Sequence, residues 1–256
     1  MTDNARFTGT RVLVTGGGRG IGRAIAQAFA REGALVAINY RSNDAEAEAC
    51  LKSLKGTGHV ALKTDIGQPG GALALVEQAI GQLNGIDVLV NNAGIHEHHP
   101  IDKVTYETWQ SEWRKTLDVN LIGAANVTFC AARHMLRERS GRIICVGSRG
   151  AFRGEPSQPA YGASKAGLHA FAQSMAIALA PYDIGVGVVA PGFVETEMVA
   201  DLLESDEGER IRAQSPFGRV ARPEEVANAV MYLADPASIW SSGAIIDVNG
   251  ASYLRS

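Results

Sequence analysis

Three residues able to do acid–base chemistry lie close together in the sequence, beginning at Ser148. Tyr161 and Lys165 are four residues apart within Tyr-Gly-Ala-Ser-Lys, so in a helix both side chains project from one face. A free tyrosine has a pKa near ~10, and a fixed cation nearby lowers that value. Bringing the pKa to about 7 requires roughly 4 kcal/mol of differential interaction. The pair predicts a tyrosine that exchanges protons with help from a lysine, with the Ser148 hydroxyl thirteen residues upstream.

A glycine-rich turn, Thr15-Gly-Gly-Gly-Arg-Gly-Ile-Gly22, lies near the start of the chain. Gly16, Gly20 and Gly22 permit a tight turn and close approach of the backbone to a pyrophosphate, which a helix N-terminus stabilises. A plain strand–helix turn is the alternative. The spacing is not G-x-G-x-x-G, and Arg23 with its neighbour replaces the Lys-Ser/Thr that phosphoryl transfer requires. The turn therefore predicts a dinucleotide site and argues against a kinase or ATPase.

Short apolar runs alternate with helical patterns along the chain, which is typical of a parallel sheet covered on both faces. The sequence predicts a single α/β domain over residues 1–256. We expect a doubly wound Rossmann fold with a roughly seven-stranded parallel sheet, helices on both faces and ligands at the carboxyl ends of the strands. The expected strands are Arg11–Thr15, Leu35–Asn39, His59–Lys63, Asp87–Asn91, Arg142–Gly147, Ile184–Ala190 and Ala244–Val248.

Composition narrows the function classes. The 256 residues are 46% hydrophobic and 20% charged with a formal net charge of −3, which gives no reason to expect nucleic acid or an anionic membrane as partner. No apolar run reaches the ~20 residues that span a bilayer, and the first residues do not resemble a secretory signal. Cys50, Cys130 and Cys145 are odd in number and widely spaced, which suits free thiols in a reducing compartment. We therefore expect a cytoplasmic protein.

The chain resembles the short-chain dehydrogenase/reductase family over nearly its whole length. The glycine turn has the family's Thr-Gly-x-x-x-Gly-x-Gly pattern, and further family motifs follow in family order and spacing. The resemblance implies an oxidoreductase that transfers a hydride between nicotinamide and a ketone or secondary alcohol. The further motifs are Asn91-Asn92-Ala93-Gly94, Asp118-Val119-Asn120, Ser148, Tyr161 with Lys165, Pro191-Gly192, Arg222–Ala227 and Val248-Asn249-Gly250.

The resemblance also implies roles for four catalytic residues. Tyr161 is the general acid/base, and Lys165 lowers its pKa and holds the nicotinamide ribose. Ser148 donates a hydrogen bond to the substrate oxygen, where negative charge develops. Asn120 resembles the family asparagine that anchors a water between the lysine and solvent; a satisfied buried amide is the alternative. A non-catalytic NADP-binding sensor is a remote alternative, because such proteins generally lose the tyrosine or the lysine.

The end of the second expected strand indicates which cofactor is used. NAD-specific Rossmann folds usually place a carboxylate there, against the ribose 2′-hydroxyl. Tyr40 holds that position here, Arg41 follows it, and Arg19 of the glycine turn is a second cation near the same corner. Two guanidiniums suit a 2′-phosphate, so we expect NADP(H) in preference to NAD(H). Two solvated surface arginines are the alternative.

Other residues are assigned to the cofactor by the resemblance. Asp65 resembles the residue that contacts adenine, with a helix cap as the alternative. Thr196 resembles the residue that contacts the nicotinamide carboxamide, with the N-cap of a lid helix as the alternative. The remaining cofactor residues are Gly16, Gly20, Ile21, Gly22, Ile66, Asn92, Ala93, Gly94, Pro191, Gly192 and Val194, together with Tyr161 and Lys165.

Histidines cluster at His96, His98 and His99, in a loop that borders the substrate in this family. Imidazoles bind zinc well, but only Glu97 accompanies them locally, so we expect a substrate-lining or exposed loop and no metal. A Ser-His-Asp hydrolase built on Ser148 is disfavoured, because no Gly-x-Ser-x-Gly elbow surrounds this serine.

The segment 193–218 is irregular and polar, and we expect it to form a lid over the substrate site. Glu195 to Glu209 carry seven acids, and no lysine or arginine lies between Lys165 and Arg210. Many relatives of this kind are 3-oxoacyl-[acyl-carrier-protein] reductases, which dock an acidic carrier. The acids argue against that role and against anionic substrates, so we expect a neutral ketone or secondary alcohol.

Two further features of the sequence concern docking of a carrier protein and assembly of subunits. Arg133, Arg137, Arg139 and Arg142 offer an alternative docking patch, so the carrier-protein role stays an alternative. The tail from Gly250 to Ser256 resembles family tails that pack across subunits, and members are commonly tetramers. We therefore expect a homotetramer.

Overall fold

A seven-stranded sheet forms the centre of the chain in the computed structural model, which describes residues 5–255. Its order is β3-β2-β1-β4-β5-β6-β7, and every neighbouring pair is parallel. The order reverses between β1 and β4, which is the switch point at which doubly wound sheets bind ligands. The strands are β1 (Arg11–Val14), β2 (Leu35–Tyr40), β3 (Val60–Lys63), β4 (Val88–Asn91), β5 (Gly141–Val146), β6 (Ile184–Pro191) and β7 (Ile245–Val248).

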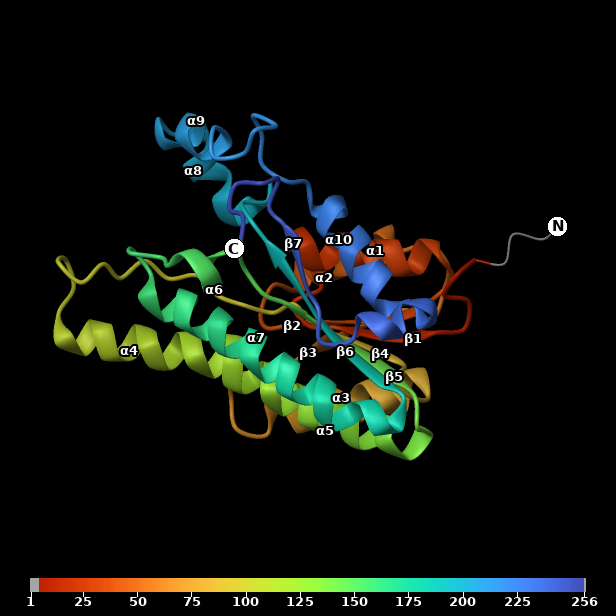
Figure 1. The fold of residues 1–256 in the computed structure, drawn as a ribbon. Coiled ribbons are helices and arrows are strands. Elements are labelled where there is room, and N and C mark those ends of the chain that lie inside the picture. Colours follow the sequence, from red (N-terminus) through yellow and green to blue (C-terminus); the bar gives the residue numbers. More distant parts are fainter. Residues whose placement is uncertain (1–4, 256) are drawn as a thin grey trace.

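These strands form where the sequence places apolar, largely β-branched runs, and each end agrees with the expected limits within one residue. Helices cover both faces of the sheet, and the predicted fold class is confirmed (Figure 1). The helices are α1 (Gly20–Arg31), α2 (Asp44–Ser53), α3 (Gly71–Leu83), α4 (Tyr106–Leu117), α5 (Ala124–Glu138), α6 (Gly150–Arg153), α7 (Pro159–Leu179), α8 (Ala200–Glu204), α9 (Glu207–Arg212) and α10 (Pro223–Ala234).

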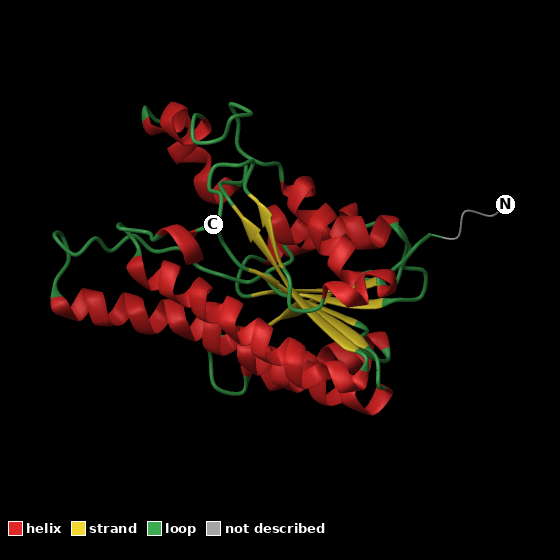
Figure 2. Cartoon of the chain, in the orientation of Figure 1, coloured by secondary structure: helices red, strands yellow, loops and turns green. Residues whose placement is uncertain are grey.

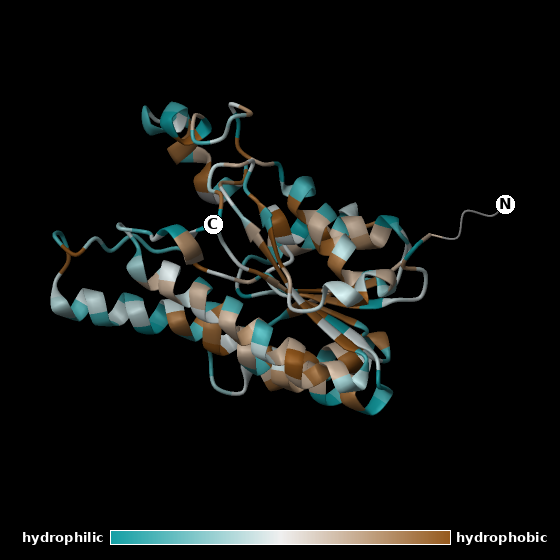
Figure 3. Ribbon diagram, in the orientation of Figure 1, coloured by the Kyte–Doolittle hydropathy of each residue, from teal (hydrophilic) through white to brown (hydrophobic). Residues whose placement is uncertain are grey.

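Two buried clusters hold the layers together, one on each face of the sheet. The first packs α1 and α10 against the sheet and includes Phe29, Ile38 and Val230. The second packs α3, α5 and α7 against the other face and includes Leu75 and Met135. The strands are coloured mainly as apolar, and the helices that cover them carry both apolar and polar residues (Figure 3). The sheet is therefore buried on both sides, as its uninterrupted apolar strands require.

The expected lid region is less irregular than the sequence suggests. It contains the short helix η3 (Glu197–Val199) followed by α8 and α9, which stand together beyond the carboxyl ends of the strands (Figure 2). Leu203 and Ile211 are buried and anchor this segment. All seven acids between Glu195 and Glu209 are exposed.

No helix among residues 5–255 is long and apolar enough to cross a membrane. The first four residues and Ser256, on which part of the expectations about the N-terminus and the tail fell, lie outside the described residues.

Candidate active site

A cavity of about 520 Å³ opens at the carboxyl ends of the central strands. Every residue assigned to the cofactor from the sequence lines it, including the glycines of the turn, Tyr161 and Lys165. Ser148 also lines it. Asn120, the remaining residue with an expected catalytic role, does not line the cavity, because its side chain is fully buried.

The glycine turn forms the cradle that a dinucleotide requires. Gly16 (φ +62°) and Gly20 (φ +50°) adopt left-handed backbone, which glycine adopts without strain. A Cβ on Gly22 would lie 2.2 Å from the Gly16 oxygen and 2.6 Å from Asn92 Nδ2. Arg19, at the N-cap of α1, makes no side-chain capping bond, so the first N–H groups of the helix remain available to an anion. The cradle therefore fits a pyrophosphate.

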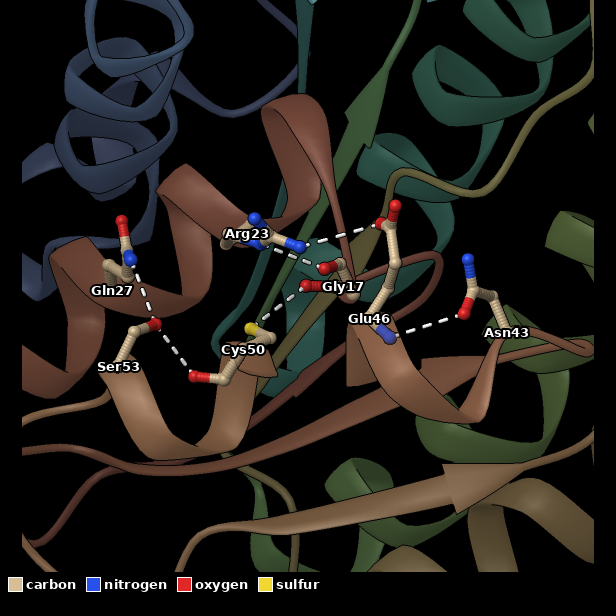
Figure 4. Close-up of polar contacts among 8 residues, drawn as sticks. Gly17, Arg23, Gln27, Asn43, Glu46, Cys50 and Ser53 are labelled. Atoms are coloured by element: carbon tan, nitrogen blue, oxygen red, sulfur yellow. Dashed lines mark hydrogen bonds and ion pairs between the residues drawn. The ribbon is translucent and has the colours of Figure 1, made fainter. Parts of the chain in front are cut away.

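Side chains of α1 and α2 make polar contacts with the backbone of the glycine turn (Figure 4). Arg23 Nε donates to the Gly18 oxygen (2.9 Å) and its Nη2 lies 3.4 Å from Glu46 Oε2. Cys50 Sγ lies 3.3 Å from the Gly17 oxygen. These contacts fix the carbonyls of Gly17 and Gly18 to α1 and α2, so the protein itself holds the turn in place.

The corner expected to bind the 2′-phosphate carries two exposed cations. Arg19 and Arg41 line the cavity, and neither guanidinium has an acceptor among the described residues. The Tyr40 hydroxyl donates to Asp44 Oδ1 (2.9 Å), and Lys63 Nζ holds the other oxygen of Asp44 (2.9 Å). The nearby carboxylate is therefore already neutralised by the protein, and the corner suits a phosphate.

Neither Asp65 nor Thr196 makes a side-chain capping bond to a helix, although Thr196 holds the N-cap position of η3. Asp65 Oδ1 accepts from the Gly67 N–H (2.9 Å) in a turn, whereas α3 begins at Gly71. Thr196 precedes η3 without a side-chain capping bond, and its Cγ2 would lie 3.3 Å from a Cβ on Gly20. Thr196 thus lies next to Gly20 of the glycine turn.

Helix α7 presents Tyr161, Lys165 and His169 at successive four-residue intervals, on one face as the spacing predicts. Pro159 opens the helix. The buried imidazole of His99 pins its first turn: Nδ1 lies 2.8 Å from the Glu97 oxygen, and Nε2 accepts from the Ala160 N–H (3.3 Å). The catalytic helix is therefore held at the end nearest the cavity.

Ser148 follows β5 and is oriented from two sides. Its Oγ accepts from the Gly150 N–H (2.9 Å), which leaves its own hydrogen free to donate into the cavity. Its N–H donates to His169 Nε2 (3.4 Å), and a Cβ on Gly147 would lie 2.0 Å from that nitrogen. Burial, with Lys165 and Arg255 nearby, lowers the pKa of His169 to about 4, so the imidazole is neutral and accepts. His169 was not identified from the sequence.

Lys165 is buried, with 4% of its surface exposed, and its Nζ donates to the Val146 oxygen (2.9 Å). Burial lowers its pKa to about 8. Burial also raises the pKa of Tyr161, opposed by a hydrogen bond to the Ser148 side chain. Burial thus opposes the lowering of the Tyr161 pKa that we expect from Lys165 and a cationic nicotinamide ring. Lys165 Nζ lies 5.7 Å from the centre of the tyrosine ring.

Asn120 lies in a π-helical turn, Asp118–Gly123, that joins α4 to α5. Its Oδ1 accepts from the Ile95 N–H (2.8 Å), and its Nδ2 donates to the Ile95 oxygen (2.9 Å) and to Ser164 Oγ (3.1 Å). The amide therefore ties the loop after β4 to the catalytic helix. A Cβ on Gly94 would lie 3.3 Å from Asn120 Oδ1 and 3.4 Å from Lys165 Nζ, so this glycine keeps the floor of the cavity clear.

The three clustered histidines lie in different environments. His96 lines the cavity and packs edge-on against Tyr161, with ring centres 5.0 Å apart. His98 is exposed, and His99 is buried beside Trp109. No group of three or more His, Cys, Asp or Glu side chains in residues 5–255 is placed to hold a metal ion.

Comparison with known proteins agrees with this geometry. A family model described as "Enoyl-(Acyl carrier protein) reductase" matches residues 16–251. The chain is 37% identical over 248 residues to 3-oxoacyl-[acyl-carrier-protein] reductase FabG of Escherichia coli, covering 97% of this chain and 99% of that one. It belongs to the short-chain dehydrogenase/reductase family.

Two further members of this family show its breadth. L-rhamnose 1-dehydrogenase (NAD(P)(+)) of a Sphingomonas strain is 36% identical over 256 residues, covering 96% of this chain and 97% of that one. A short chain dehydrogenase from Burkholderia cenocepacia, solved in complex with NADP, superposes with a TM-score of 0.86 at 30% identity, covering 96% and 99% of the two chains. The chain is therefore an oxidoreductase, as the sequence predicts.

This short-chain dehydrogenase/reductase has cavity residues that sequence reasoning missed. Arg149, Glu155 and Gln158 lie between the catalytic serine and tyrosine and line the cavity. A polar loop confined between two catalytic residues is the signal that would have found them. The lid acids, in contrast, face solvent, and of the seven only Glu197 lines the cavity. The charge inside the site is therefore not set by the acidic lid.

We expect kcat/KM for NADPH to fall as pH rises through about 8, where Lys165 loses its proton. This parameter reports ionisations of the free enzyme. Below that pH the ammonium is charged and able to bind the ribose hydroxyls; above it the neutral amine binds them weakly. The pKa of Tyr161 is raised, so this tyrosine stays protonated over the same range. A flat profile from pH 6 to pH 10 would contradict the assignment.

Proposed function

We propose that the chain is an NADP(H)-preferring reductase of free ketones, running in reverse on secondary alcohols, with Tyr161 as the general acid/base. The observation that carries this is that Ser148, Tyr161 and Lys165 line the same cavity as the glycine turn. A non-catalytic sensor would not need this group intact.

In this mechanism the bound nicotinamide supplies or accepts the hydride. Ser148 donates a hydrogen bond to the carbonyl oxygen, where negative charge develops. Tyr161 delivers its proton to that oxygen, so that ketone, one hydride and one proton become the alcohol. Lys165 would hold the nicotinamide ribose, and its positive charge would favour the phenolate of Tyr161, whose pKa burial raises. Asn120 ties the loop after β4 to the catalytic helix, and segment 193–218 closes over the substrate.

The preference for NADP(H) rests on the unpaired guanidiniums of Arg19 and Arg41 and on Asp44, whose carboxylate is already neutralised by Lys63. A 2′-phosphate accepts charge-assisted hydrogen bonds from both arginines.

We expect Arg41→Asp to shift the ratio of NADPH to NADH affinity towards NADH by roughly 10- to 100-fold, because a charge-assisted contact becomes a repulsion. Fluorescence titration of both cofactors measures the ratio. Lys55→Asp, which changes charge in the same way at an exposed site outside the cavity, is the matched control. An unchanged ratio in Arg41→Asp would make this arginine a surface residue.

The alternative function is 3-oxoacyl-[acyl-carrier-protein] reduction, which the similarity to FabG favours. Two observations stand against it. The exposed lid acids lie near the mouth of the cavity, where they repel an acidic carrier. The arginine patch lies at the opposite end of β5: Arg142 is about 20 Å of strand away from Ser148. Arg139 and Arg142 also donate to backbone oxygens, including those of Pro181 and Asp183.

The test of the proposed function is NADPH consumption with a panel of free ketones beside an acetoacetyl thioester, with Tyr161→Phe as the blank. Preference for free ketones supports the proposal. Strong preference for the thioester would support the carrier-protein alternative, and absence of Tyr161-dependent turnover on every ketone and thioester would contradict both.

We expect a homotetramer in solution. Large apolar side chains are exposed on two separate parts of the surface: Phe129 (66%) on α5, and Tyr232 (49%) and Trp240 (98%) near the free edge of β7. Two such patches suit an assembly with two different dyads. Light scattering should give four times the 27.0 kDa chain mass, and a monomeric mass at working concentration would refute this. The three free cysteines fit the reducing cytoplasm, where we place the protein.

A further inference from the structure

The residue after the catalytic serine is a buried cation without an anion. Arg149 has only 4% of its surface exposed, although burying a guanidinium is costly unless a charge partner is present. Its Nη1 donates to the neutral Ser252 hydroxyl (2.6 Å), and its guanidinium lies 5.3 Å from the centre of the Phe193 ring. No carboxylate of residues 5–255 lies within ion-pair distance of it.

The unpaired part of this guanidinium faces open space. Nε and Nη2 of Arg149 have no acceptor among the described residues, yet they are not among the polar atoms sealed inside the protein. Arg149 and Phe193 line both the catalytic cavity and a smaller cavity of about 190 Å³ behind the lid segment. Nε and Nη2 of Arg149, two charged hydrogen-bond donors, therefore lie where the two cavities adjoin. They are next in sequence to Ser148, which we expect to bind the substrate oxygen.

Two acidic side chains that line the cavities beside Arg149 form no ion pair with it. Glu225, in the wall of the smaller cavity, is held by both terminal nitrogens of Arg219 (2.6 and 2.7 Å). Glu155 lines the catalytic cavity and acts on Arg149 through space, but forms no ion pair with it. Of the lid acids only Glu197 lines the catalytic cavity, and it forms no ion pair with Arg149. The site therefore retains one cation for which the protein itself provides no anion.

We propose that Arg149 binds an anionic group of the substrate, so that the enzyme acts on ketones or secondary alcohols that carry a carboxylate. This rests on the proposed function and names its substrate class. The carbonyl lies at Ser148 and Tyr161, and the carboxylate lies against Nε and Nη2 of Arg149, which present the forked geometry that carboxylates accept. The expectation of a neutral substrate, drawn from the acidic lid, is revised accordingly.

The test compares ketones that differ only in charge: acetoacetate with acetoacetamide, and 4-oxopentanoate with 4-oxopentanamide. In the wild-type protein, kcat/KM should be higher for the acid of at least one pair. Arg149→Gln should lower the acid-to-amide ratio by about 10- to 100-fold, the range for a hydrogen-bonded charge. Arg149→Lys should retain part of the ratio, and Glu155→Gln should raise it, because a competing negative charge is removed.

The outcomes separate the two proposals. No Tyr161-dependent NADPH oxidation on any of these ketones would contradict the proposed function itself. Turnover of the amides with an unchanged ratio in Arg149→Gln would overturn the carboxylate site and leave Arg149 as a latch for the tail at Ser252. If Arg149→Gln does not fold, inhibition of the wild type decides: butyrate should compete with the ketone and butyramide should not. Equal inhibition by the two would overturn the inference.

Discussion

Tyr161→Phe should lower kcat by roughly 10²- to 10⁴-fold, the usual contribution of a positioned general acid, while NADPH still binds. The substitution removes one oxygen and keeps the ring, so the edge-on contact with His96 remains (centres 5.0 Å apart). Ser148 loses the partner that it contacts at the tyrosine oxygen but keeps its bond from the Gly150 N–H. Steady-state NADPH oxidation measures the loss, and fluorescence titration measures the remaining affinity.

Tyr106→Phe is the matched control for this change. It removes the same hydroxyl from an exposed tyrosine at the start of α4, 70% of whose surface is accessible, and should leave kcat unchanged. A Tyr161→Phe enzyme that kept more than about a tenth of wild-type kcat, which a contribution of this size does not allow, would remove the tyrosine from the mechanism.

Gly22→Ala should destabilise the protein by about 1–3 kcal/mol, the cost of adding a methyl group to a closed space, and weaken NADPH binding. The new Cβ would lie 2.2 Å from the Gly16 oxygen and 2.6 Å from Asn92 Nδ2. That amide donates to the Thr15 and Gly16 oxygens (2.9 and 3.0 Å), so displacing it opens the whole glycine turn. Urea unfolding gives the stability, and NADPH titration gives the affinity.

The control is the same substitution at a glycine with room for a side chain. A Cβ on Gly81, in α3, meets nothing within 4 Å. Gly81→Ala should therefore stabilise the helix by about 0.5–1 kcal/mol. Opposite signs at the two positions would show that close packing at Gly22 causes the loss. Unchanged stability and affinity in Gly22→Ala would mean that the turn relaxes without consequence.

The sequence alone determined the fold class, the strand limits and many of the residues that line the cavity, including the glycine turn and the Tyr161–Lys165 pair. Strand positions follow from local apolar runs, which the parallel sheet buries on both faces. The Tyr161–Lys165 pair follows from helical periodicity, and the glycine turn from the few conformations that such a spacing permits. Each of these signals lies within a few residues along the chain, so periodicity and backbone stereochemistry suffice to find it.

Tertiary structure decided what depends on contacts between distant segments. His169 reaches Ser148 across 21 residues of sequence, and Arg149 meets Ser252 across 103. The tyrosine pKa, expected to fall, rises without ligand because burial outweighs the favourable contacts. The acids of the lid led to the expectation of a neutral substrate, but their side chains are exposed to solvent. One buried arginine, Arg149, faces the site instead. Burial and charge pairing arise only when the chain is folded, and they set the charge that a substrate meets.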